Sequence, residues 1–185
     1  MPASEIETYH RFIVGTIRHL ATTMRQIPQD RWEFAIAKPA PSSREIAGHC
    51  WMGLVCDRQH ILEPDCSNHL KIEAPPSTQG EMCDLLNQEA DLWSEMIKCL
   101  TPDMLEEPRK QFGKHELNVR FFLAHMAMHV SSKWGQFSML YYAWGFDGEE
   151  SYSAPDPNYY YGFTESPTWP AGELQNVGES SCLSR

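Results

Sequence analysis

Residues 117–145 read LNVRFFLAHMAMHVSSKWGQFSMLYYAWG, and this stretch decides the predicted fold. Its apolar residues recur at the spacing of an α-helix, which places many of them on one buried side. Gly145 follows the last of them, and glycine often ends a helix because it adopts a left-handed backbone without strain. We therefore predict a long helix from about Leu117 to Trp144, with Gly145 as its C-terminal cap.

Two histidines, His125 and His129, stand four residues apart in this stretch. On a helix they share one face, one turn apart, so that both imidazoles can bind one metal ion. His49 lies in a second stretch, SSREIAGHCW, at residues 42–51. A third imidazole from another helix would leave one coordination position open, as a catalytic metal requires. The chain has eight histidines, so chance spacing and hydrogen-bonded core histidines are the alternative interpretation.

Three further segments have helical periodicity and are separated by proline-containing breaks: Ser4–Gln26, Ser43–Leu62 and Thr78–Leu100. Ser4 with Glu7 three residues later has the pattern of a capping box at the start of the first segment. The stretch around Pro108 and Gly113 is expected to be irregular, and no strand-like alternation is visible. Four amphipathic helices with short connections predict an all-α fold, an up-down four-helix bundle.

The composition changes after the fourth predicted helix. Residues 147–185 are rich in glycine, proline, serine, tyrosine and acidic residues, and they lack helical periodicity. We therefore predict two parts, a bundle over residues 1–146 and an irregular aromatic and proline-rich C-terminal tail over residues 147–185. The aromatic residues are expected to pack part of the tail onto the bundle, with its last ten or so residues disordered.

Length and charge limit the functional classes. At 185 residues the chain can bury the core of one domain. Its formal net charge of −10 argues against nucleic acid and anionic membranes as partners, because both require a basic surface. No apolar run is long enough to span a bilayer, and the N-terminus does not have the pattern of a signal peptide. We expect a cytoplasmic protein whose six cysteines, none in a CxxC pair, are free thiols.

The two histidine-containing segments resemble the DinB-like superfamily of four-helix bundles, which is related to mycothiol- and bacillithiol-dependent transferases and isomerases. Residues 42–49, SSREIAGH, are similar to the family's second-helix signature, in which the residue matching His49 binds a divalent metal. Residues 125–145 are similar to its fourth helix, with Gly135, Gln136 and Gly145 at the family spacing. The resemblance covers roughly residues 4–145 and implies a divalent metal, zinc or nickel, and a low-molecular-weight thiol as a possible co-substrate.

One residue departs from the family pattern. Alignment on Gly135 and Gln136 puts the two fourth-helix ligand positions at His129 and Lys133, where the family usually has two histidines. Lysine is a poor ligand because its ammonium must first lose a proton. His125 could replace it as third ligand, His49 and His129 could hold the metal alone, or the metal could be lost, with Lys133 as a cation or base. We favour the first outcome, a site of His49, His125 and His129.

The resulting hypotheses differ in chemistry. A metal-dependent enzyme would activate a water or a thiol for transfer, hydrolysis or isomerisation of a small organic molecule. A metal-free bundle would bind a small molecule, with Lys133, the candidate catalytic residue, and His129 orienting it. A stress-associated bundle protein would have a second copy of itself as its main partner, in a homodimer.

Asp57 and Arg58, further along the second predicted helix, are expected to be a solvated pair.

Overall fold

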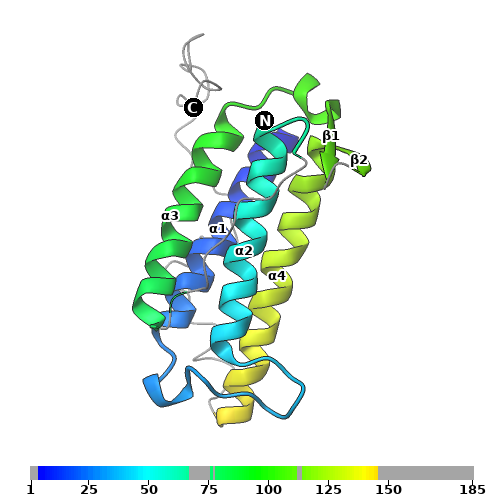
Figure 1. Ribbon diagram of the computed structural model, residues 1–185. Helices are drawn as coiled ribbons and strands as arrows, with labels where there is room; N and C mark the ends of the chain where they lie inside the picture. Colours follow the sequence, from blue (N-terminus) through cyan, green and yellow to red (C-terminus); the bar gives the residue numbers. More distant parts are fainter. Residues whose placement is uncertain (1–3, 67–75, 77, 112–113, 146–185) are drawn as a thin grey trace.

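The computed structural model describes residues 4–66, 76, 78–111 and 114–145. Within these residues the chain is mostly helical, with four long helices and a small two-stranded sheet (Figure 1). The helices are α1 (Glu5–Arg25), α2 (Ser43–Leu62), α3 (Gln79–Lys98) and α4 (Val119–Trp144). Each corresponds to a predicted helix to within two residues at either end, so this part of the prediction is confirmed. The predicted tail, residues 147–185, lies outside the described residues.

The local sequence explains where the helices begin and end. Four side chains each accept a hydrogen bond from the backbone N–H three residues later and so cap a helix: Ser4, Ser42, Thr78 and Asn118. At Ser42 the bond is reciprocal, because its own N–H donates to the Glu45 carboxylate at 2.7 Å. Gly145 ends α4 with φ of 86°, the left-handed conformation predicted for it.

A short hairpin lies where the sequence predicted irregular chain. Strands β1 (Pro108–Gln111) and β2 (His115–Asn118) pair antiparallel, and they follow the 3-10 helix η2 (Asp103–Glu106). The prediction of no strands is therefore wrong. Strands of four residues are too short to display a periodic pattern, and proline is tolerated at the first residue of an edge strand.

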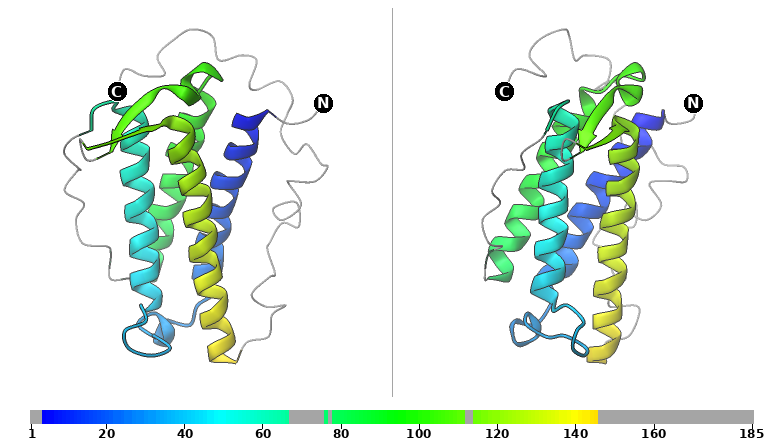
Figure 2. Two further views of the ribbon diagram at one scale, coloured as in Figure 1. Left: turned by 90° about the vertical axis from the view of Figure 1, so that its right-hand side faces the viewer. Right: turned by 45° about the vertical axis from the view of Figure 1, so that its right-hand side comes forward.

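The hairpin is fixed to the end of α2 by polar bonds. The Lys110 backbone N–H donates to the Pro64 carbonyl at 3.0 Å. Arg109 Nε donates to the Ile61 carbonyl at 2.8 Å. Backbone carbonyls at the end of a helix have no partner within the helix, so these donors satisfy groups that would otherwise be buried unpaired. The hairpin thus lies across one end of the four long helices (Figure 2).

The helices share one apolar core. α1 packs against α3 and α4, and α2 packs against α4 and α3, and Figures 1 and 2 show α2 and α4 side by side. The large side chains that exclude water from this core are Trp32, Trp93, Phe122 and Phe137. Trp93 on α3 also donates its indole N–H to the Leu54 carbonyl on α2 at 3.2 Å. The contact between α2 and α4 is one of the places where polar side chains from facing helices meet.

The cysteines only partly follow the sequence prediction. Cys50, Cys56 and Cys83 are free thiols, as expected. Cys99 takes part in a disulfide bond, so the prediction is wrong for that residue. None of the helices in the described part of the chain is long and apolar enough to cross a membrane.

Candidate functional site

Polar side chains from α2 and α4 meet in the seam between these two helices. His49 comes from the second turn of α2, and His129 and Lys133 come from successive turns of α4. Because residues four apart share a helix face, both α4 side chains are turned toward the same partner helix. The structure therefore brings together the three positions to which the family resemblance assigned ligands. We call His49, His129 and Lys133, with Gln136, the seam cluster.

Lys133 is the centre of the seam cluster. Its ammonium group donates to His49 Nδ1 at 3.0 Å and to Gln136 Oε1 at 3.2 Å. Only 7% of the lysine is exposed, and this burial lowers its pKa from the usual value. An ammonium has three N–H donors, so two of them are satisfied by these bonds. Lys133 is thus a partly desolvated amine that two hydrogen bonds hold in place, and it is not a surface lysine.

His49 receives the bond from Lys133 on its Nδ1 atom, which requires a lone pair there and a proton on Nε2. Burial and the neighbouring Lys133 charge both lower the pKa of His49. The residue as a whole is exposed, unlike Lys133 behind it. His49 is therefore a neutral imidazole at neutral pH, and it lies at the solvent-facing side of the seam cluster.

His129 lies edge-on to His49, with ring centroids 5.1 Å apart and planes at 79°. Burial, and then the charge of Lys133, lowers its pKa to about 4. Its Nε2 atom is buried, and a hydrogen bond to the His49 backbone partly offsets the lowering of this pKa.

Gly53 explains how the His129 ring fits against α2. A Cβ atom at position 53 would lie 2.9 Å from His129 Nε2, closer than such contacts normally occur. The ring thus occupies the space that a side chain at this position would fill. Gly53 was not predicted to take part in the site, although a glycine inside a helix, where it weakens the helix, could have indicated a close approach.

His125 forms a separate pair beside the seam cluster. Its Nδ1 lies 2.6 Å from Asp57 Oδ2, and its ring centroid is 5.9 Å from that of His129. Asp57 is only 4% exposed, whereas the His125 side chain is 40% exposed. An Nδ1–H donated to the carboxylate fixes the ring and leaves Nε2 as the nitrogen available for other partners.

The expectation that Asp57 and Arg58 form a solvated pair is wrong. Asp57 is buried and bonds His125 of α4, while Arg58 makes two bonds of 2.9 Å to Glu89 of α3. Neighbouring residues of a helix point about 100° apart, so Asp57 and Arg58 face different helices. The carboxylate partner of His125 was therefore missed by the sequence analysis.

The described residues do not form a ready metal site. Across them, no group of three or more histidine, cysteine, aspartate or glutamate side chains is placed to hold a metal ion. His49 Nδ1 is bonded to Lys133, His125 Nδ1 is bonded to Asp57, and His129 Nε2 lies against Gly53. The assignment of one ion to His49, His125 and His129 therefore stays a prediction.

The seam cluster can instead supply one cation and two neutral imidazoles. Cys50, next to His49 in sequence, adds no charge, because burial raises the pKa of its thiol to about 12. The one charged group of the cluster is Lys133, whose lowered pKa increases the share of neutral amine at a given pH. This combination favours binding of a carbonyl or carboxylate group and attack by an amine.

No protein-family model matches the chain, and no curated protein matches it. The resemblance to the DinB-like superfamily therefore stays an expectation from the residues of the two helices. The geometry of His49, His129 and Lys133 is the basis on which function can be proposed.

Proposed function

We propose that the chain is an up-down bundle of the DinB-like kind that binds a small organic molecule at the seam cluster without a metal. Lys133 serves there as the cation or base. The observation that carries the proposal is the 3.0 Å contact from Lys133 Nζ to His49 Nδ1. The amine thereby stands beside the imidazole that the family resemblance assigns to a metal.

A molecule with a carbonyl or carboxylate group suits this cluster best. Lys133 uses two of its three donors on His49 and Gln136, which leaves one N–H for an oxygen of the bound molecule. The imidazoles of His49 and His129 are neutral at neutral pH, since both pKa values are lowered. An anionic or strongly polarised oxygen would therefore interact chiefly with the ammonium.

The same amine can react with a carbonyl compound when it is neutral. Its nitrogen attacks the carbonyl carbon, a C=N bond replaces the C=O bond, and the carbonyl oxygen leaves as water with the two protons of the neutral amine. Burial lowers the pKa of Lys133, so the neutral amine is present at lower pH than in an exposed lysine. His49, bonded to the same nitrogen, is placed to accept the proton that the ammonium loses.

Reductive labelling tests this proposal. The full-length protein is incubated with pyruvate and cyanoborohydride, which reduces the imine to a stable secondary amine that peptide mass spectrometry locates. We expect Lys133 to be labelled several-fold faster than Lys110 and Lys114, two exposed lysines of the hairpin region. His49→Ala should slow labelling of Lys133 while leaving the two reference lysines unchanged. Labelling of Lys133 no faster than that of the references would refute the proposal.

A second candidate is the metal-dependent enzyme, with zinc or nickel and a thiol co-substrate. It is favoured by one observation, the 2.6 Å bond from His125 Nδ1 to the buried Asp57, because metal-binding histidines commonly bond a carboxylate through their other nitrogen. Metal analysis of protein purified without chelator separates the two candidates. About one equivalent of metal, lost in His129→Ala, would support the enzyme.

Lys133→His provides the complementary test of the second candidate. If the seam is a metal site that has lost a ligand, restoring histidine should tighten metal binding at least about tenfold, or roughly 1.4 kcal/mol. If neither the wild type nor Lys133→His binds zinc or nickel, the metal-free proposal is the better one.

A further inference from the structure

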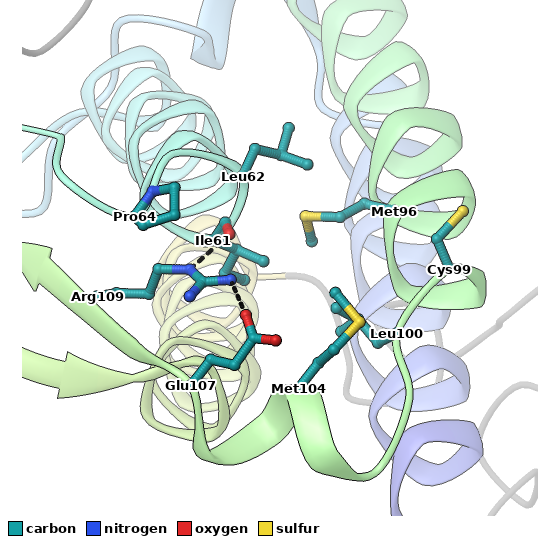
Figure 3. Close-up of a pocket in the computed structure, with 9 residues that line it drawn as sticks. All are labelled: Ile61, Leu62, Pro64, Met96, Cys99, Leu100, Met104, Glu107 and Arg109. Carbon is teal, nitrogen blue, oxygen red and sulfur yellow. Dashed lines mark hydrogen bonds and ion pairs between the residues drawn. The ribbon is translucent and has the colours of Figure 1, made fainter. Parts of the chain in front are cut away.

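A cavity lies at the hairpin end of the molecule and shares no residue with the seam cluster. Its volume is about 170 Å³. It is formed where the end of α2, the end of α3, η2 and β1 meet (Figure 3). The residues that line it are Ile61, Leu62, Pro64, Met96, Cys99, Leu100, Met104, Glu107 and Arg109.

Most of the cavity wall is apolar. Ile61, Met96 and Leu100 are buried, and Met104 of η2 packs against the same core. Figure 3 shows the thioethers of Met96 and Met104 pointing into the space in front of Arg109. Thioether sulfur makes favourable contacts with aromatic rings. An apolar cavity of about 150 Å³ is large enough for benzene, so the size fits one aromatic ring.

The polar part of the wall is the ion pair of Arg109 and Glu107, in which each charge neutralises the other. Arg109 is only 5% exposed, and its three nitrogens donate to the Ile61 carbonyl, the Pro108 carbonyl and Glu107 Oε2 at 2.8, 3.0 and 2.9 Å. A guanidinium has five N–H groups. Two of them, one on each terminal nitrogen, have no partner among the described residues. Buried donors of this kind can be satisfied by an oxygen atom of a bound molecule.

We propose that this cavity binds a neutral single-ring aromatic molecule with one hydroxyl or carbonyl group. The ring would lie between Met96 and Met104, and its oxygen would accept a hydrogen bond from Arg109. A neutral ligand is favoured because Glu107 would repel an anion and Arg109 would repel a cation. This binding site goes beyond the proposed function, since its lining residues belong to none of the residues used there.

The test uses three probes of nearly equal size on the isotope-labelled full-length protein: benzyl alcohol, benzoate and benzylammonium. Amide and Arg109 Nε–H chemical shifts are followed by NMR during titration. We expect saturable shifts from benzyl alcohol that centre on Leu62, Leu100 and Arg109. Its affinity should exceed that of either ion by about fivefold or more, because burying a charge opposes binding. No saturable shifts at these residues, or equal affinity for all three probes, would overturn the proposal.

Two variants sharpen the result. Met104→Trp fills the cavity and should weaken binding of benzyl alcohol by about tenfold. In a close-packed interior, moving the indole aside to reopen the cavity would cost free energy. Met139→Trp is the matched control, because Met139 is 59% exposed on α4, and it should bind as the wild type does. Unchanged binding in folded Met104→Trp would place the probe elsewhere and overturn the proposal.

Glu107→Gln tests the polar end without filling the cavity. The Glu107 side chain is 47% exposed, so the fold should tolerate the change. Removing its charge leaves Arg109 uncompensated, and benzoate should gain affinity relative to benzyl alcohol by about threefold or more. An unchanged ratio would show that Arg109 and Glu107 do not contact the probe, which contradicts the proposed orientation.

Discussion

The helix pair α1–α3 and the helix pair α2–α4 place their charged residues differently. Between α1 and α3 the ion pairs Arg18–Asp91 and Arg25–Asp84 lie at the solvent-exposed edge. Exposed pairs of this kind contribute about 0–1 kcal/mol each. The stability of this helix pair must therefore come mainly from the buried apolar side chains beneath them.

The seam between α2 and α4 buries charged groups instead. Lys133 and Asp57 are almost inaccessible to solvent, and each is bonded to a histidine of the facing helix. Removing a charged group from water is unfavourable even when it gains a partner. An interface that served only to hold two helices together would gain more from apolar residues. The difference is consistent with the proposal that the seam is the functional side of the bundle.

The largest expected effect is on the apolar side of this comparison. Leu20 of α1 is fully buried, and Leu20→Ala should lower the free energy of unfolding by about 2–5 kcal/mol because it removes apolar contacts and leaves a cavity. Urea unfolding measures the change. Met139→Ala, at a position 59% exposed, is the control and should change stability by no more than about 0.5 kcal/mol. Similar losses at both positions would contradict the picture of a stability set by the core.

Acid should weaken the α1–α3 pair through His10. Its Nε2 bonds Ser94 of α3 at 2.8 Å. Burial, followed by the charges of Lys98, Arg11 and Arg18, lowers the pKa of His10 to about 4. In the unfolded chain the imidazole titrates near its ordinary value, about 6.5. As the pH falls below about 6.5 the unfolded state therefore binds the proton first, so stability is full above that pH and is lost until about pH 4.

The pH effect of His10 can be isolated by substitution. His10→Asn should reduce the loss of stability between pH 7 and pH 4.5, a loss to which one such group contributes up to about 3 kcal/mol. Urea unfolding of both proteins at several pH values gives the two slopes. His115→Asn, at an exposed position on β2, should keep the wild-type slope. If the dependence of stability on pH had the same slope in His10→Asn and the wild type, His10 would not be the cause of the loss in acid.

Gly53 tests the close packing of the seam. Gly53→Ala would place a Cβ atom 2.9 Å from His129 Nε2, and the resulting displacement should destabilise the protein by about 1–3 kcal/mol. Gly135→Ala on α4 is the matched control, because a Cβ atom there meets nothing within 4 Å. That control should be stabilising by about 0.5–1 kcal/mol, since alanine favours a helix over glycine. A stabilising Gly53→Ala would mean that the His129 ring does not occupy this space.

Lys133→Met should have the smallest effect of these substitutions on the free energy of unfolding, and it should raise stability rather than lower it. The change removes a buried ammonium but keeps an unbranched apolar chain, so stability should rise by about 0.5–2 kcal/mol. Thermal unfolding at pH 7 measures the gain, and the labelling at position 133 is lost by definition. A clear loss of stability would indicate that the bonds to His49 and Gln136 hold α4 in place. The seam would then be structural rather than functional.

The helices were predictable because their signals are local. Ser42 with Glu45, and the glycine at position 145, define helix ends within a few residues of sequence. The spacing of His125 and His129 likewise placed both rings on one face of α4. Periodicity over twenty or more residues outweighs errors at single positions, and for this reason the predicted bounds of α2 agree with the observed ones.

The hairpin and the partners of the histidines depended on tertiary structure. β1 and β2 have four residues each, too few for a pattern, and they are stabilised through contacts with α2. Asp57 and His125 are 68 residues apart in the chain, and Lys133 and His49 are 84 apart. Helical spacing predicted that His125 and His129 share a face of α4, but it did not predict that Asp57 is buried opposite them. Only the packing of α2 against α4 decided that Lys133, rather than His125, bonds His49, because that choice depends on the relative position of two helices that no local signal encodes.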